Sequence, residues 1–192
     1  MKIETQYYRT FIGLPVKVSD GILEARQELL ECLTGERISW VDPERFHITL
    51  RFLGNTQVSM IRDINQALKN GIKVPKKSHI MLTHPGSFGP RKRPRVIWVG
   101  FESSTLFEML KSDIDQALES CGIPLVDQPF RAHLTLGRLR SIKDLNGFHN
   151  AVAAMKDRFS DLVEFNRLVF YRSELGKGGP VYTPLYQVEF KE

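Results

Sequence analysis

The sequence predicts an α+β fold of two related lobes, in which two antiparallel sheets with outer helices surround a central cleft. Helix patterns alternate with pairs of strand patterns, which is typical of antiparallel sheets covered by helices. No linker rich in Pro, Gly or Ser divides the 192 residues, so we expect a single bilobal domain over residues 1–192. A short motif also occurs twice, 86 residues apart, and a repeat near half the chain length indicates two related lobes.

The first half of the chain contains four strand patterns and two helix patterns. Alternating or β-branched runs predict strands at Tyr7–Leu14, Ile38–Val41, Phe46–Leu53 and Ser78–Thr83. The first predicted helix, Ser19–Cys32, carries apolar residues at helical spacing. The second predicted helix, Ser59–Asn70, is followed by Gly71 in the position that commonly ends a helix.

The second half repeats this alternation. Strands are predicted at Arg95–Phe101, Arg131–Leu139, Leu162–Tyr171 and Val181–Phe190, and the last two are expected to pair around the glycine-rich turn 176–180. A capping box formed by Thr105 and Glu108 predicts a helix that closes at Gly122. A further helix is expected over Lys143–Arg158.

Composition and charge narrow the class of protein. The hydrophobic fraction of 42% is enough to close a core and excludes a disordered, collagenous or coiled-coil chain. No apolar run reaches the length of a membrane helix, and the first ten residues lack the apolar core of a signal peptide. We therefore expect a soluble, cytoplasmic monomer. The net charge of +5 favours anionic partners such as nucleotides or RNA.

The repeated motif is R-x-H-[IL]-T-L, found at Arg45–Leu50 and at Arg131–Leu136. Residues i and i+2 of a strand face the same side, so each His is expected to point the same way as the Thr that follows it. The intervening aliphatic residues then point into the apolar layer beneath.

If the lobes face each other about a pseudo-twofold axis, His47, His133, Thr49 and Thr135 line one cleft. Two imidazoles can serve as general base and general acid near neutral pH. Two hydroxyls can donate hydrogen bonds to phosphoryl oxygens as negative charge builds. This set is suited to the chemistry of phosphate esters.

Two other interpretations of the motif are a pair of structural histidines and a metal site. Packing alone does not require His and Thr together in both copies. Two histidines without a nearby Cys, Asp or Glu fall short of the three or four ligands that zinc uses. The sequence therefore predicts neither a metal nor another cofactor.

With both copies of the motif in view, the sequence resembles the 2H phosphoesterase superfamily, whose signature is a pair of H-x-T-x motifs. Within it the resemblance is to the RNA 2′,3′-cyclic phosphodiesterases, also called 2′-5′ RNA ligases. It extends along nearly the whole chain. The matching segments are YRTFIGLP (8–15), HITLRFLG (47–54), Gly86–Phe88 with RVIWVG (95–100), FRAHLTLGR (130–138) and SELGKGGPVY (173–182). Ala132 departs from the pattern, because relatives often carry Pro there.

This resemblance implies a bilobal α+β fold and hydrolysis of RNA 2′,3′-cyclic phosphate ends to 2′-phosphates. It also implies that His47 is the proton donor and His133 the proton acceptor, with Thr49 and Thr135 binding phosphate. Joining RNA by a 2′-5′ bond would be the same chemistry in reverse.

Four further features are weighed as substrate contacts. Arg131 would share the face of His133 if its strand is regular, and Tyr182 follows the glycine-rich segment and could reach the cleft. The basic run Arg91–Arg95 could steer RNA, or it could be a solvated loop. Gly176–Gly179 with Lys177 resembles a phosphate-binding loop but is better explained as a hairpin turn.

Two rival functions remain open at this point. One is a phosphodiesterase that acts on 2′,5′-oligoadenylate or another cyclic nucleotide. The other is an RNA-binding module without catalysis, which would have no use for two titrating imidazoles.

Overall fold

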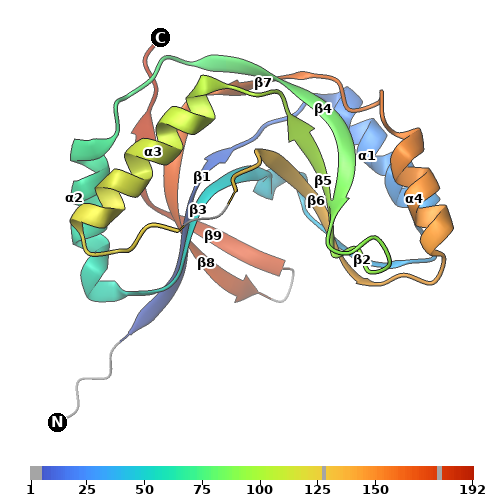
Figure 1. Ribbon diagram of the computed structural model, residues 1–192, viewed down its shortest axis with the longest axis horizontal. Helices are drawn as coiled ribbons and strands as arrows, with labels where there is room; N and C mark the ends of the chain where they lie inside the picture. Colours follow the sequence, from blue (N-terminus) through green and yellow to red (C-terminus); the bar gives the residue numbers. More distant parts are fainter. Residues whose placement is uncertain (1–5, 127–128, 177–178) are drawn as a thin grey trace.

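A computed structural model describes residues 6–126, 129–176 and 179–192 as two antiparallel sheets with four helices (Figure 1). The first sheet has the strand order β3 (His47–Gln57), β1 (Tyr7–Pro15), β8 (Arg167–Gly176), β9 (Gly179–Glu189). The second has the order β2 (Arg37–Trp40), β6 (His133–Ser141), β5 (Val96–Phe101), β4 (Ser78–Phe88), β7 (Leu162–Phe165). The predicted α+β class with two antiparallel sheets is confirmed.

The helices pack in two pairs on opposite sides of the molecule. In Figure 1, α2 (Ile61–Gly71) lies beside α3 (Thr105–Ser120), and α1 (Asp20–Cys32) lies beside α4 (Leu145–Ala154). Short 3₁₀ turns at Pro43–Arg45 and Val58–Met60 precede β3 and α2. Within the described residues no helix is long and apolar enough to cross a membrane.

Each half of the chain completes the sheet of the other half. The first half runs β1-α1-β2-β3-α2-β4, and its last strand pairs with β5 in the second sheet. The second half runs from β5 through α3, β6, α4 and β7 to β8, and β8 returns to pair with β1. Because neither sheet is complete without a strand from the other half, we propose that the two lobes fold as one domain.

The core lies between the sheets and the helices. Ile48 and Leu50 of β3 are almost fully buried, as are Leu134 and Leu136 of β6. The aliphatic residues of both motifs therefore enter the apolar layer, as their alternation predicts.

Several boundaries differ from the prediction. The expected strand Leu162–Tyr171 is two strands that part at Asn166, because β7 pairs with β4 whereas β8 pairs with β1. Strand β4 continues to Phe88, well past the expected end at Thr83. The last helix is also shorter than predicted and covers Leu145–Ala154.

The start of α3 differs from the prediction by one residue. Ser104 is the N-cap, and its side chain accepts a hydrogen bond from the Leu106 backbone N–H. Thr105 is thus the first helical residue, and the predicted capping box is wrong. A serine immediately before a threonine gives the sequence two adjacent candidates for one cap.

Candidate active site

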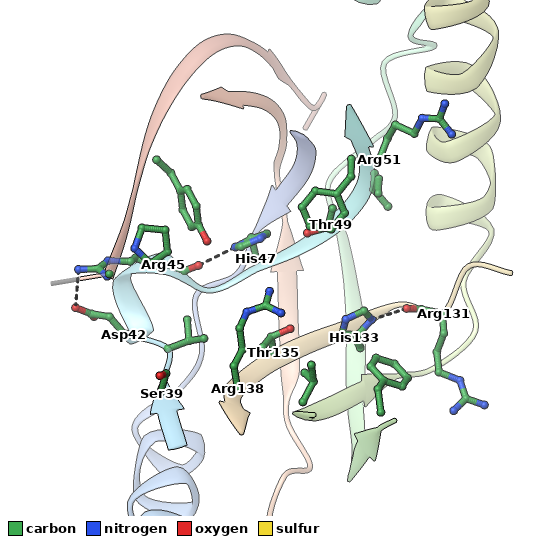
Figure 2. Close-up of a pocket in the computed structure, with 18 of the residues that line it drawn as sticks. Ser39, Asp42, Arg45, His47, Thr49, Arg51, Arg131, His133, Thr135 and Arg138 are labelled. Atoms are coloured by element: carbon green, nitrogen blue, oxygen red, sulfur yellow. Dashed lines mark hydrogen bonds and ion pairs between the residues drawn. The ribbon is translucent and has the colours of Figure 1, made fainter. Parts of the chain in front are cut away.

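Strands β3 and β6 carry both His-Thr pairs into one cavity of about 820 Å³. His47, Thr49, His133 and Thr135 all line it, and Figure 2 shows the two strands running past each other with these side chains between them. β3 belongs to the first sheet and β6 to the second, so each sheet contributes one pair. The structure thus brings the four residues together, as the sequence predicts.

The two histidines are held by the same contact. The Nδ1 atom of His47 lies 2.8 Å from the carbonyl oxygen of Arg45, and the Nδ1 atom of His133 lies 2.7 Å from that of Arg131. Since a carbonyl oxygen can only accept, Nδ1 carries the proton in both rings. Nε2 is therefore the atom of each ring that is free to gain or lose a proton.

Aromatic rings pack against both imidazoles. The ring centroid of His47 lies 4.8 Å from that of Phe11 and 5.1 Å from that of Tyr182. The ring of His133 meets Phe88 edge to face at 4.8 Å. These contacts limit rotation of the imidazoles and remove water from one side of each ring.

Burial and positive charge lower the pKa of both histidines. Desolvation is the largest cause for each, and it outweighs the hydrogen bond from Nδ1 to the carbonyl, which raises the pKa. The guanidinium of Arg138 lowers both pKa values further. Both imidazoles are therefore neutral at pH 7 in the free protein, and a bound phosphate anion would favour their protonation.

Arg138 enters the cavity because β6 contains a bulge. Thr135 pairs with Trp98 and Gly137 with Ile97, so Leu136 is the extra residue. The alternation of faces shifts by one residue after this bulge, which buries Gly137 and turns Arg138 toward the cleft. In Figure 2 the Arg138 side chain rises between the two strands toward His47.

β3 has the same bulge at the equivalent position. Thr49 pairs with Gly13 and Arg51 with Ile12, which leaves Leu50 as the extra residue. Arg51 is buried as a result, and Phe52 lines the cavity with 56% of its surface exposed.

Arg138 and Phe52 line the site but were not predicted from the sequence. Strict alternation from His47 and His133 would place Arg51 and Gly137 on the cleft face, and Arg138 and Phe52 on the opposite face. The available signal was a shared leucine, Leu50 or Leu136, three residues after each His. That signal does not identify a bulge without knowledge of the partner strand.

Arg131 and Tyr182 both line the cavity. Arg131 precedes β6, which begins at His133, so the expected strand start at Arg131 is wrong and the face-sharing argument for Arg131 fails. Figure 2 shows its guanidinium pointing away from the histidines, and it lies 5.6 Å from the ring of Trp98. Its carbonyl oxygen accepts the hydrogen bond from Nδ1 of His133, and its positive charge contributes to the lowered pKa of that histidine.

The glycine-rich segment and the basic run occupy different places. Gly176 and Gly179 line the cavity, whereas Lys177 and the glycine after it lie outside the described residues. The run Arg91–Arg95 connects β4 to β5 and is absent from the described lining of the cavity. In the described part of the chain, no group of three or more His, Cys, Asp or Glu is arranged to hold a metal ion.

Two solved structures share this fold over nearly their whole length. The protein TT0787 of Thermus thermophilus superposes with a TM-score of 0.70 at 24% identity, covering 95% of this chain and 98% of that one. LigT of E. coli, solved as a complex with 3′-AMP, superposes with a TM-score of 0.64 at 18% identity, covering 97% and 100%.

Curated relatives match at the level of sequence. The RNA 2′,3′-cyclic phosphodiesterase of Aeropyrum pernix is 31% identical over 157 residues, which cover 81% of this chain and 88% of the relative. That of Thermotoga maritima is 26% identical over 191 residues, which cover 95% and 96%.

The family model described as LigT-like phosphoesterase matches residues 12–98 and 102–182. Each of these two segments contains one His-Thr pair, in agreement with the repeat of the sequence and with the two interlocked halves of the fold. The chain therefore belongs to the LigT-like phosphoesterases, the 2H phosphoesterase enzymes that its duplicated motif resembles.

Proposed function

We propose that this enzyme hydrolyses the 2′,3′-cyclic phosphate at an RNA end to a 2′-phosphate without a metal ion. The observation that carries the proposal is the matched pair of imidazoles. Both line one cavity, both are held through Nδ1 by a carbonyl oxygen, and both leave Nε2 for proton transfer. Curated relatives that bear this activity in their names support the choice of substrate.

The two sheets present these imidazoles from different strands, which suits displacement at phosphorus. The attacking water and the departing oxygen lie in line on opposite sides of the phosphorus atom. One histidine beside each of them supplies the two proton transfers that the reaction needs.

The reaction proceeds as follows with the roles that the family resemblance implies. Nε2 of His133 accepts a proton from water as its oxygen bonds to phosphorus. The bond from phosphorus to the ribose O3′ breaks, and O3′ takes the proton from Nε2 of His47. The products are a 2′-phosphate and a 3′-hydroxyl, and exchange with solvent resets both imidazoles.

Other lining residues stabilise the charge that develops on the phosphoryl oxygens. The hydroxyls of Thr49 and Thr135 donate hydrogen bonds to them, and the guanidinium of Arg138 offsets their negative charge. Tyr182, packed against His47, and Arg131, at the rim, are proposed to contact the rest of the nucleotide.

The same acid and base can also form a 2′-5′ bond between RNA ends, when the 5′-hydroxyl of a second strand replaces water in the attack on the cyclic phosphate. His133 then accepts the proton of that hydroxyl as its oxygen bonds to phosphorus, and O3′ leaves with the proton of His47. Cleavage of the 2′-5′ bond is the reverse step, in which the two histidines exchange roles. Ligation is therefore part of the proposal for this site.

Product identification tests the proposed function. An oligoribonucleotide that ends in a 2′,3′-cyclic phosphate is incubated with the enzyme, and the product is analysed by ³¹P NMR and mass spectrometry. We expect a 2′-phosphate product. A 3′-phosphate product would mean that the bond from phosphorus to O2′ breaks instead of the bond to O3′, which would contradict the proposed reaction. Turnover of 2′,5′-linked oligoadenylate alone would support the rival phosphodiesterase, and binding without any turnover would support a non-catalytic module.

A further inference from the structure

The cavity extends beyond the histidines toward the outer edge of the second sheet, where it is strongly basic. Ser39, Arg138 and Arg140 line it there, on β2 and on the last part of β6. Asp42 is the only carboxylate among the described lining residues, and it is occupied by the Glu44 backbone N–H and by Arg45, 3.8 Å away. Within the described residues neither Arg138 nor Arg140 forms an ion pair.

The opposite end of the cavity also has cations, but a carboxylate neutralises two of them. Asp115 lies 3.6 Å from the guanidinium of Arg51 and 2.6 Å from the ammonium of Lys111. Arg51 also donates a hydrogen bond to the carbonyl oxygen of Pro124, so it is a buried structural residue. Among the described lining residues Arg131, whose guanidinium lies over the ring of Trp98, is the remaining cation there, whereas Arg138 and Arg140 stand together at the end lined by β2 and β6.

The strands at this end place their cations in a row. Ser39 pairs with Arg138, which puts both side chains on the cleft face. Arg37, two residues before Ser39 on β2, is exposed and shares this face by alternation. Nε of Arg140 donates a hydrogen bond to Oγ of Ser39 over 3.1 Å, which holds the guanidinium against the sheet and leaves its Nη groups for an anion.

The spacing fits a chain of phosphates. Alternate residues of a regular strand, such as Arg37 and Ser39 on β2, lie about 6.6 Å apart, comparable to the separation of neighbouring phosphates in an extended single strand. Arg140 is the extra residue of a bulge in β6, because Leu139 pairs with Ile38 and Ser141 with Arg37. A guanidinium presents its N–H groups in a fork that matches two phosphate oxygens.

We propose that this basic track, formed by Arg37, Ser39 and Arg140 beside Arg138, binds the phosphodiester backbone of the RNA strand upstream of the reacting end. The inference rests on the proposed function for the identity of the substrate, and it adds the path along which the RNA strand leaves the cavity. The cyclic phosphate lies between the histidines, and the strand leaves the cavity over β2 and β6. The penultimate phosphate then meets Arg140.

Steady-state kinetics with two substrates test the track. One substrate is a mononucleotide 2′,3′-cyclic phosphate, and the other is a tetraribonucleotide with the same cyclic end. We expect Arg140→Gln to lower the ratio of kcat/KM for the tetranucleotide to that for the mononucleotide by roughly 3–10-fold, mainly through KM. Arg62→Gln removes the same charge from an exposed position on α2, away from the cavity, and should keep the wild-type ratio.

The salt dependence gives a second readout. Each phosphate contact with a single strand contributes about 0.7 to the slope of log affinity against log salt concentration. Arg140→Gln should lower that slope by about this amount in fluorescence anisotropy with the tetranucleotide. An unchanged ratio together with an unchanged slope would overturn the track.

The two proposals fail in different ways. If the wild-type protein turns over neither substrate, the proposed function is contradicted. The track is still decided in that case by whether Arg140→Gln weakens binding of single-stranded RNA more than Arg62→Gln does. Equal weakening by both variants would mean that the track does not exist.

Discussion

Phe52 and Arg138 occupy equivalent positions in the two halves of the molecule, each two residues after the bulged leucine of its strand. The backbone is therefore repeated while the chemistry is not. One strand presents an exposed phenyl ring to the cavity, and the other presents a guanidinium. This difference breaks the symmetry of the two His-Thr pairs and suits a substrate with an aromatic base and an anionic phosphate.

The exposed ring of Phe52 is expected to stack on the base of the nucleotide. Phe52→Leu keeps an apolar side chain but removes the flat surface, and stacking on an aromatic ring is worth about 1–3 kcal/mol per base. KM for 2′,3′-cyclic nucleotides should rise about 10-fold at similar kcat. The cyclic phosphate of an abasic ribose serves as the control, and an equal rise in KM for both substrates would contradict the assignment.

The two histidines are expected to act as one unit. His47→Ala and His133→Ala should each lower kcat by about 10²–10⁴-fold, because a positioned acid or base contributes that much. The double variant should lose far less than the product of these factors, since groups that act together are not additive. Thr49→Ala and Thr135→Ala should cost about 10–10³-fold, as for lost oxyanion donors.

His79→Ala provides the matched control for these variants. His79 lies on β4 near Glu164, outside the described lining of the cavity, and its loss should leave kcat unchanged. An unchanged kcat in His47→Ala would refute the shared site.

A substrate with a good leaving group separates the roles of the two histidines. A nitrophenolate departs without a proton, so a nitrophenyl phosphodiester should restore much of the rate of His47→Ala. It should restore little of the rate of His133→Ala, because water still needs a base. The reverse pattern would exchange the two roles, and equal rescue would mean that neither role is distinct.

The lowered pKa values set the pH dependence of kcat/KM. One histidine must be protonated and the other neutral, so the profile should be bell-shaped. Because burial and Arg138 lower both pKa values in the free enzyme, the maximum should lie below about pH 6.5. The rate falls on the alkaline side as the acid loses its proton, and on the acidic side as the base gains one.

Arg138→Gln tests whether the charge of Arg138 contributes to the lowered pKa values of the two histidines. Removing the cation raises the pKa of both imidazoles, so both limbs of the profile should move to higher pH while kcat/KM itself drops. Arg138→Lys retains the charge and should keep the limbs near their wild-type positions. If both limbs of the pH profile lie at the same pH in the wild-type enzyme and in Arg138→Gln, Arg138 does not influence the pKa values of the histidines.

Catalysis is expected to need no metal ion. Two imidazoles supply both proton transfers, and the two hydroxyls with Arg138 supply the charge stabilisation for which other phosphoesterases use cations. Activity should survive extensive dialysis against EDTA. Loss of activity that returns on addition of zinc, magnesium or manganese would contradict this expectation.

Local patterns in the sequence determined the placement of the two His-Thr pairs. The alternation of His, aliphatic, Thr and Leu within each motif decides which side chains face the cleft and which enter the core, because side-chain direction along a regular strand depends only on neighbouring residues. The recurrence of the motif after 86 residues indicated two lobes with one His-Thr pair each. The four residues His47, Thr49, His133 and Thr135 therefore followed from the sequence alone.

Other features depend on partners that are distant in the chain, and only the tertiary structure decided them. Leu50 and Leu136 bulge because β3 and β6 must match the register of β1 and β5, and this reverses the faces of the residues that follow, up to the next irregularity of each strand. Arg138 and Phe52 reach the cavity for that reason. The division at Asn166 likewise arises because β7 and β8 pair with strands of different sheets. The alternation of residues within one strand does not predict such pairings, since they are set by packing between segments that are far apart in sequence.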